Sequence, residues 1–237
     1  MKNQHLAGFV ASVLCFSATV AQAQDYYYLS PDAGPVFRLG IGPSLFEDGK
    51  LTQFSGPGIP TTGPVPSKVD FDTGFAFDAA LGWAFNKYAA LDFETGFIGA
   101  KINNVPGYLS DNSRLYNVPF MVNATLSLPI PRTNIIPYVG AGVGGADVVF
   151  DTDNFTQNDS GIFVSGSEND VVFAGQVFAG VRFELTRHLS LDLGYKYFAT
   201  GNPTFSYSPR FGGGPNLDVG FRGARTHSVL AALRFDF

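Results

Sequence analysis

Apolar and polar residues alternate with a period of two along most of the chain, the pattern of strands with one apolar and one polar side. The clearest case is the last segment, where the apolar face holds Val229, Ala231, Leu233, Phe235 and Phe237. Only Leu230 falls out of phase there. An amphipathic strand of this kind needs another strand along its edge. We expect the first strand of the chain to supply that partner.

Eight amphipathic segments follow one another, at 36–46, 71–85, 89–102, 115–128, 135–150, 170–185, 189–197 and 224–237. The connections alternate between long ones, at 47–69, 103–114, 151–169 and 199–223, and short ones, at 86–88, 129–134 and 186–188. Strict alternation places every long connection at one end of an up-and-down arrangement. An even number of membrane strands closes into a ring without edges. The pattern predicts an all-β fold, an eight-stranded antiparallel transmembrane β-barrel over residues 36–237.

The composition indicates a protein surface that faces lipid, in a chain without membrane-spanning helices. Charged residues make up 15% of the chain, against about 25% in an ordinary soluble domain. Aromatic residues are abundant, with 24 Phe and 10 Tyr. No apolar run after residue 23 is long enough for a membrane helix. The net charge of −5 and the lack of a basic cluster argue against nucleic acid as a partner.

The amino-terminal region has the features of a cleaved signal peptide. Lys2 precedes an apolar stretch at 6–20, and the small-residue motif at 21–23 predicts cleavage after Ala23. Residues 24–35 then form a lead-in to the barrel. The alternative is a lipoprotein that begins at Cys15, which the preceding residues 12–14 fit poorly. The predicted mature chain has no cysteine.

The polar face of the segments combines small residues with charges, which suits a narrow lumen better than a water-facing exterior. We expect the following charges to line the lumen: Arg38, Asp72, Asp92, Glu94, Arg182, Glu184, Asp192, Lys196 and Arg234. Asp78, Gln176 and Asp236 fall on the same face. Buried charges are tolerated when they are paired. The favoured interpretation is a set of ion pairs that fills the barrel, and the alternative is a conducting pore.

An aromatic cluster marks the first short connection. Trp83, Phe85 and Tyr88 lie beside it in the sequence. Together with Phe235 and Phe237 they predict the periplasmic aromatic girdle of a membrane barrel.

Three segments resemble the small outer-membrane β-barrel family, which includes the opacity-type surface proteins and the membrane domain of outer membrane protein A. They are 137–144 (PYVGAGVG), 189–197 (LSLDLGYKY) and 227–237 (HSVLAALRFDF). The resemblance implies the outer membrane of a Gram-negative-type envelope. It also implies insertion by the barrel assembly machinery, with Leu233, Phe235 and Phe237 as the assembly signal. The long, proline-rich first loop departs from the opacity pattern.

Candidate chemistry is sparse. His227 and Ser228 suggest a lipid A-modifying enzyme, but consecutive strand residues point to opposite faces and cannot form a simple catalytic pair. Neither a metal nor a cofactor is expected. The loop at 205–214 combines aromatic residues with Arg210, which suits either a glycan or host-surface ligand, or aromatic packing over the barrel mouth.

We therefore expect a non-enzymatic, monomeric barrel with a structural or surface-interaction (adhesin- or opacity-like) role. The alternatives are a narrow porin for small solutes and, less favoured, a lipid A-modifying enzyme. The expected partners are outer-membrane lipid and lipopolysaccharide, the barrel assembly machinery, and a host or surface ligand at the long loops.

Overall fold

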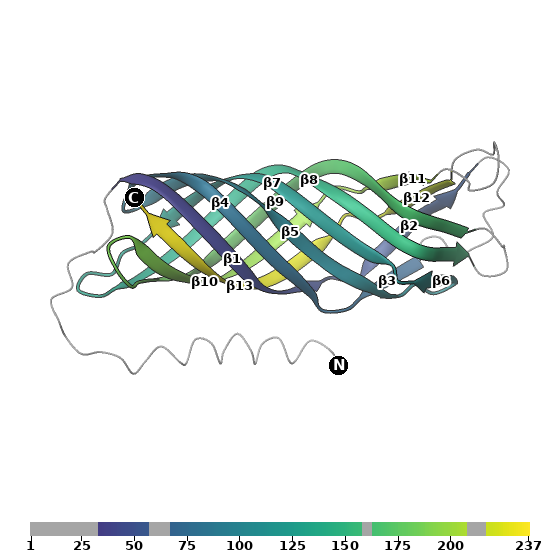
Figure 1. Cartoon of the computed structure of the whole chain (residues 1–237), viewed down its shortest axis with the longest axis horizontal. Helices are drawn as coiled ribbons and strands as arrows, with labels where there is room; N and C mark the ends of the chain where they lie inside the picture. The colour runs from purple at the N-terminus through teal and green to yellow at the C-terminus, as the bar shows by residue number, and fades with distance from the viewer. Residues whose placement is uncertain (1–32, 57–66, 158–162, 208–216) are drawn as a thin grey trace.

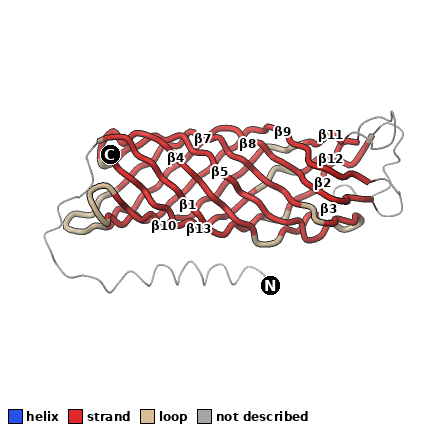
Figure 2. The backbone as a smooth tube through the Cα atoms, in the orientation of Figure 1, coloured by secondary structure: helices blue, strands red, loops and turns tan. Residues whose placement is uncertain are grey.

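Antiparallel strands make up nearly all of the structure. The computed structural model describes residues 33–56, 67–157, 163–207 and 217–237. Thirteen strands join in these ranges, and Figure 2 shows how little loop lies between them. No helix within the described ranges has the length and apolar character that a membrane crossing requires.

Eight of the strands form a closed ring (Figure 1). They are β1 (Gly34–Phe46), β4 (Gly74–Asn86), β5 (Ala89–Asn104), β7 (Arg114–Ser127), β8 (Ile135–Gln157), β9 (Phe163–Glu184), β10 (Leu189–Thr200) and β13 (Arg225–Asp236). Each pairs with the next in this order, and β13 pairs with β1 from Val36↔Asp236 to Phe46↔Thr226. The prediction that the last strand closes the ring against the first is confirmed.

The long connections contain more structure than the sequence pattern indicated. Five further strands lie within them: β2 (Gly49–Ser55), β3 (Ser67–Phe71), β6 (Tyr108–Asp111), β11 (Thr204–Tyr207) and β12 (Leu217–Phe221). β2 pairs with β3 and β12, β12 with β11, β3 with β5, and β6 with β8. The expectation of four long loops was wrong, because these segments prolong the barrel wall as an extension. We call this end the long-loop end and the opposite one, where β13 finishes, the short-turn end (Figure 1).

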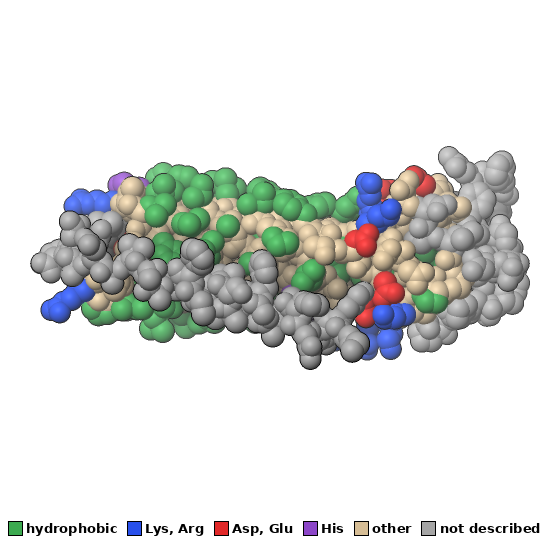
Figure 3. Space-filling view, turned by 90° about the horizontal axis from the view of Figure 1, so that it is seen from below, with side chains coloured by type: hydrophobic (Ala, Val, Ile, Leu, Met, Phe, Trp, Pro, Cys, Tyr) green, Lys and Arg blue, Asp and Glu red, His purple; other side chains and the backbone are tan. Residues whose placement is uncertain are grey.

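The outside of the ring carries a belt of exposed apolar side chains. It includes Leu39, Ile41, Leu81, Phe93, Val122, Leu126, Val139, Val143, Val177 and Leu233, each between 38% and 63% exposed. In Figure 3 hydrophobic side chains cover this part of the surface, and charged side chains gather where it ends toward the long-loop end. Such a belt is typical of a surface that faces lipid, because an apolar patch this large is rare on a soluble protein.

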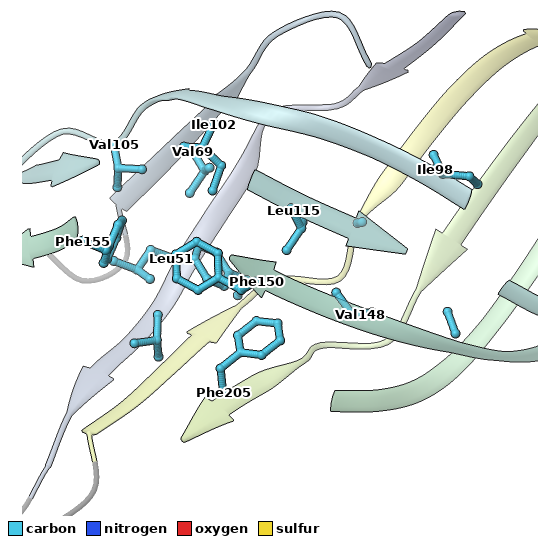
Figure 4. Packing of buried hydrophobic residues seen from close by; sticks show 14 of the residues in the cluster. Leu51, Val69, Ile98, Ile102, Val105, Leu115, Val148, Phe150, Phe155 and Phe205 are labelled. Carbon is cyan, nitrogen blue, oxygen red and sulfur yellow. The ribbon is translucent and has the colours of Figure 1, made fainter. Parts of the chain in front are cut away.

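The inside of the barrel has two layers of different character. Toward the short-turn end the buried inward side chains are mostly charged or polar. Toward the long-loop end they are apolar and form one cluster, part of which Figure 4 shows. Phe150, Phe155 and Phe205 in that cluster are fully buried and converge with Leu51 from β2.

The strand β8 runs through both layers and changes its pattern between them. In its first half Val139 and Val143 face outward and are 53% and 61% exposed. In its second half Val148 and Phe150 face inward and are fully buried. Its apolar residues therefore move from odd to even positions, so the strand is apolar outside in the belt and apolar inside in the extension.

Candidate functional site in the barrel lumen

Glu94 on β5 is the centre of the polar layer, and its side chain is fully buried. Its carboxylate accepts hydrogen bonds from Arg38 Nη2 at 2.6 Å and from Lys196 Nζ at 2.6 Å. It also accepts from the amides of Asn123 and Gln176, each at 3.1 Å. These four donors come from β1, β10, β7 and β9. One carboxylate thus connects five of the eight ring strands across the lumen.

Neighbouring groups complete the ion cluster, which we define as Arg38, Asp78, Asp92, Glu94, Asn123, Gln176 and Lys196. Lys196 also donates to Asp78 at 2.5 Å, and Asn123 donates to Asp92 at 2.8 Å. The Gln176 side-chain amide donates to Asn123 Oδ1 at 2.7 Å. Charges held this closely away from water are stable only as a fully connected set. The cluster therefore connects strands around the ring from inside the lumen.

Glycines on β8 leave the room that these crossing side chains occupy. A Cβ atom on Gly142 would lie 1.9 Å from Asn123 Oδ1, and one on Gly140 would lie 2.3 Å from the ring of Phe178. Real atoms do not approach this closely. Over residues 139–144, the outward positions carry apolar side chains that suit lipid, and the inward positions are glycines because the lumen side chains leave no room for a Cβ at Gly140 and Gly142.

A second group of ion pairs lies nearer the short-turn end. Arg182 binds Asp192 through two nitrogens at 2.9 and 3.2 Å, and Arg234 Nη2 lies 2.7 Å from Asp236. Glu184 is also buried there. A small pocket opens at this end and is lined by Arg182, Glu184, Arg234 and Asp236 among others.

The structure places eight of the nine predicted lumen charges inside the ring, and Asp72 is the exception. Asp72 is exposed, and its N–H donates to the Lys101 carbonyl at 3.0 Å. The expected continuous segment 71–85 is interrupted between β3 and β4 at this point. Because this interruption removes the regular alternation, the parity argument that placed Asp72 in the lumen fails.

The apolar layer above the ion cluster was not predicted from the sequence. The ring of Phe150 lies 5.0 Å from Phe221, 5.5 Å from Phe155 and 5.7 Å from Phe205, measured between centroids. The Tyr207 hydroxyl donates to the Phe150 carbonyl at 2.8 Å, and burial raises the pKa of Tyr207. The available signal was the change of parity at Val148 and Phe150, at the end of the predicted segment 135–150.

Of the loop at 205–214, Phe205 and Tyr207 are buried in this layer, as expected for aromatic packing at the barrel mouth. Arg210 lies outside the described residues, as do Cys15 and the predicted signal peptide.

His227 and Ser228 lie on opposite sides of the wall. Ser228 is buried in the lumen and donates to Ser44 at 3.0 Å. His227 lies on the outer wall, where its Nδ1 is 2.5 Å from the Tyr195 hydroxyl and its Nε2 is 3.0 Å from Glu47. The two residues form no nucleophile–base pair.

A sequence model described as the outer membrane protein beta-barrel domain matches residues 9–219. The chain belongs to this family. Its location is accordingly the outer membrane. An uncharacterized protein of Brucella suis biovar 1 is 29% identical over 201 residues, with 69% of each chain covered, and one from Brucella melitensis biotype 1 matches to the same extent.

Solved structures of small outer-membrane barrels share the fold of this family member. OprG from Pseudomonas aeruginosa aligns with a TM-score of 0.58 at 14% identity, covering 89% of this chain and all of that one. Neisserial surface protein A aligns at 0.51 with 16% identity, covering 87% of this chain and all of that one. Identities this low establish the fold alone. The prediction of an eight-stranded outer-membrane barrel is confirmed.

Proposed function

We propose that this outer-membrane barrel is a closed, non-conducting protein that anchors a folded extension at the cell surface, where the extension takes part in surface interactions. The observation that supports the proposal is the presence of two successive buried clusters inside the ring. The ion cluster around Glu94 links side chains from five strands in the polar layer, and the phenylalanine-rich cluster around Phe150 is buried in the apolar layer.

The proposed role is structural rather than catalytic. The separation of His227 and Ser228 supports this view, because acyl-transfer chemistry requires a nucleophile and a base within hydrogen-bonding distance. The extension supports a surface role, because it is a folded wall with its own buried core and its strands β2, β11 and β12 lie at the end opposite the short-turn end (Figure 1).

Assembly is proposed to depend on the outward side of β13. Leu233 is 44% and Phe237 is 66% exposed on that side, and Phe235 stacks on Phe37 of β1 with ring centroids 6.3 Å apart. We infer that the barrel assembly machinery recognises these three side chains, and that Trp83, Phe85 and Tyr88, all exposed near the short-turn end, form the periplasmic girdle.

Planar-bilayer recording of the purified, refolded protein tests the closed lumen. We expect insertion without discrete conductance steps, because an eight-stranded bore is just filled by side chains. A general porin in the same bilayer serves as the positive control. Reproducible single-channel steps from the pure protein would establish the alternative function, a narrow porin for small solutes.

A further inference from the structure

A charged collar lies on the outer wall where the apolar belt ends toward the long-loop end; Figure 3 shows part of it. We define its cations as Lys68 on β3, Lys101 on β5, Arg114 on β7 and Arg225 on β13, all exposed. Charged groups at the end of an apolar belt suit the head-group region of a membrane. The four cations differ in how they are paired.

Two of the collar cations have carboxylate partners on the protein. Lys68 Nζ lies 2.7 Å from Asp70 and 3.0 Å from Asp48. Arg225 lies 3.7 Å from Glu47. Their charges are neutralised locally, so neither needs an external anion.

Lys101 and Arg114 are arranged differently, because they face each other directly across the β5–β7 ladder. Within the described ranges neither has a carboxylate within 4 Å. Asp151 lies opposite Arg114 on β8, and the charges of Asp151 and Asp153 attract the guanidinium from that flank, beyond salt-bridge distance. Like charges placed directly opposite each other on a sheet destabilise it. An anion between them would remove that cost.

An aromatic platform, formed by Tyr116 and Phe97, lies next to the two cations on the side toward the apolar belt. The Arg114 guanidinium donates to the Tyr116 hydroxyl at 3.4 Å, and the Tyr116 ring packs on Phe97 with centroids 5.1 Å apart. Tyr116 lies opposite Gly99, where an added Cβ would lie 2.6 Å from the tyrosine ring. Aromatic side chains with a polar end suit the boundary between acyl chains and head groups.

The wall below this platform is apolar. Phe93 and Phe120 are 50% and 46% exposed and continue the surface into the belt. Cations, aromatic rings and apolar side chains therefore follow one another in the order of phosphate, head group and acyl chain in a membrane lipid.

We propose that Lys101 and Arg114 bind the phosphate of a phosphorylated outer-leaflet lipid whose acyl chains lie along Phe93 and Phe120. Guanidinium groups bind phosphate oxygens in a bidentate manner, and a lysine adds a compact second charge. Tyr116 orients the guanidinium from below, which leaves its remaining N–H groups for the ligand.

The test measures binding of bis-phosphorylated lipid A to the refolded barrel in detergent by native mass spectrometry. The test variant is Lys101→Gln with Arg114→Gln, and the matched control is Lys68→Gln, which removes a collar cation that already has carboxylate partners. Heat-modifiable electrophoretic mobility verifies that all three proteins are folded. We expect the double variant to bind about ten-fold more weakly or worse, since two charge-assisted contacts are lost. The control is expected to bind like the wild type.

Three outcomes would overturn the proposal. The first is equal affinity of the double variant and the wild type. The second is an equal loss of affinity in Lys68→Gln, which would make the effect one of total charge. The third is equally tight binding of dephosphorylated lipid A by the wild type, which would show that the acyl chains alone are recognised.

Discussion

The part of the barrel inside the belt and the extension beyond it are built from the same strands with opposite arrangements of polarity. Within the belt, Val143 of β8 is exposed and Glu94 of β5 is buried. Within the extension, Val148 of β8 is buried and Lys101 of β5 is exposed. Each part places apolar side chains where water is absent, outside in lipid and inside in the extension. The solvent around the wall therefore decides which face of a continuous strand is apolar.

The two parts are also held together by different forces. Inside the belt, buried charges in the lumen stabilise the ring when they are paired. Removal of one partner leaves another charge buried and unpaired, which lowers the free energy of unfolding. The extension has an aromatic core in which each side chain contributes by packing, as in a soluble barrel. Substitutions in the two parts should therefore destabilise the protein in different ways.

The largest effect is expected from Glu94→Gln. The change removes one of the two buried carboxylates that Arg38 and Lys196 share and leaves only Asp78, so the free energy of unfolding should fall by about 3–5 kcal/mol. Urea unfolding in lipid vesicles, followed through the single tryptophan, Trp83, measures this loss. The control Glu47→Gln breaks only exposed pairs and should cost about 1 kcal/mol or less. Equal losses for the two variants would mean that the ion cluster does not hold the ring.

A large but local effect is expected from Phe150→Ala. Truncation of a buried phenylalanine costs about 3–5 kcal/mol, and here the loss falls on the extension. Hydrogen exchange should rise in β2, β11 and β12, while the amides of β1 and β13 stay protected. Uniformly increased exchange around the whole ring would show that the two parts unfold as one unit.

Substitution by leucine of two fully buried asparagines on β7 is expected to change the free energy of unfolding in opposite directions. Asn123 makes hydrogen bonds to Asp92, Glu94 and Gln176, so Asn123→Leu should destabilise the barrel by about 2 kcal/mol. The side chain of Asn117 has no hydrogen-bond partner within the described ranges and lies opposite Ile98 and Val148. Asn117→Leu should therefore be neutral or stabilise by about 1 kcal/mol. A loss of stability in both variants would indicate that the two layers do not differ.

The smallest effect on stability is expected from deletion of Phe237. The residue is 66% exposed and its N–H donates to the Pro35 carbonyl at 3.0 Å, so the assembled barrel should lose about 1 kcal/mol. Its assembly into the outer membrane should fall several-fold, if Phe237 belongs to the assembly signal. The yield of heat-modifiable protein in cells measures assembly, and equal yields with and without Phe237 would contradict this role.

Local periodicity was sufficient to predict the ring but not the extension. The alternation in 224–237 identified both faces of β13, and it explains Leu230, which is buried in the apolar cluster although it lies between belt residues. Strands such as β2 and β12 are short and lie among glycines and prolines, so their partners depend on the folded wall rather than on local pattern. The position of Asp72 could not be predicted because a break in the strand carries no periodic signal.

The polar face of the ring strands indicated which charges fill the lumen but not how they connect. The role of Glu94 as the shared acceptor depends on the stagger between strands that are distant in the sequence, since Arg38 and Lys196 reach it from β1 and β10. Such a stagger is set by the closure of the ring. It therefore appears only in the three-dimensional structure.

The reversal of polarity along β8 can be measured directly with single spin labels on the predicted cysteine-free mature chain. Labels at positions 143, 148 and 151 should report, respectively, contact with lipid-soluble oxygen, contact with neither reagent, and contact with a water-soluble nickel complex. Val143 is 61% exposed in the belt, Val148 is fully buried, and Asp151 is on the outer wall of the extension. Access of the nickel complex to position 148, or of oxygen alone to position 151, would contradict the account that the wall reverses its polarity where the membrane ends.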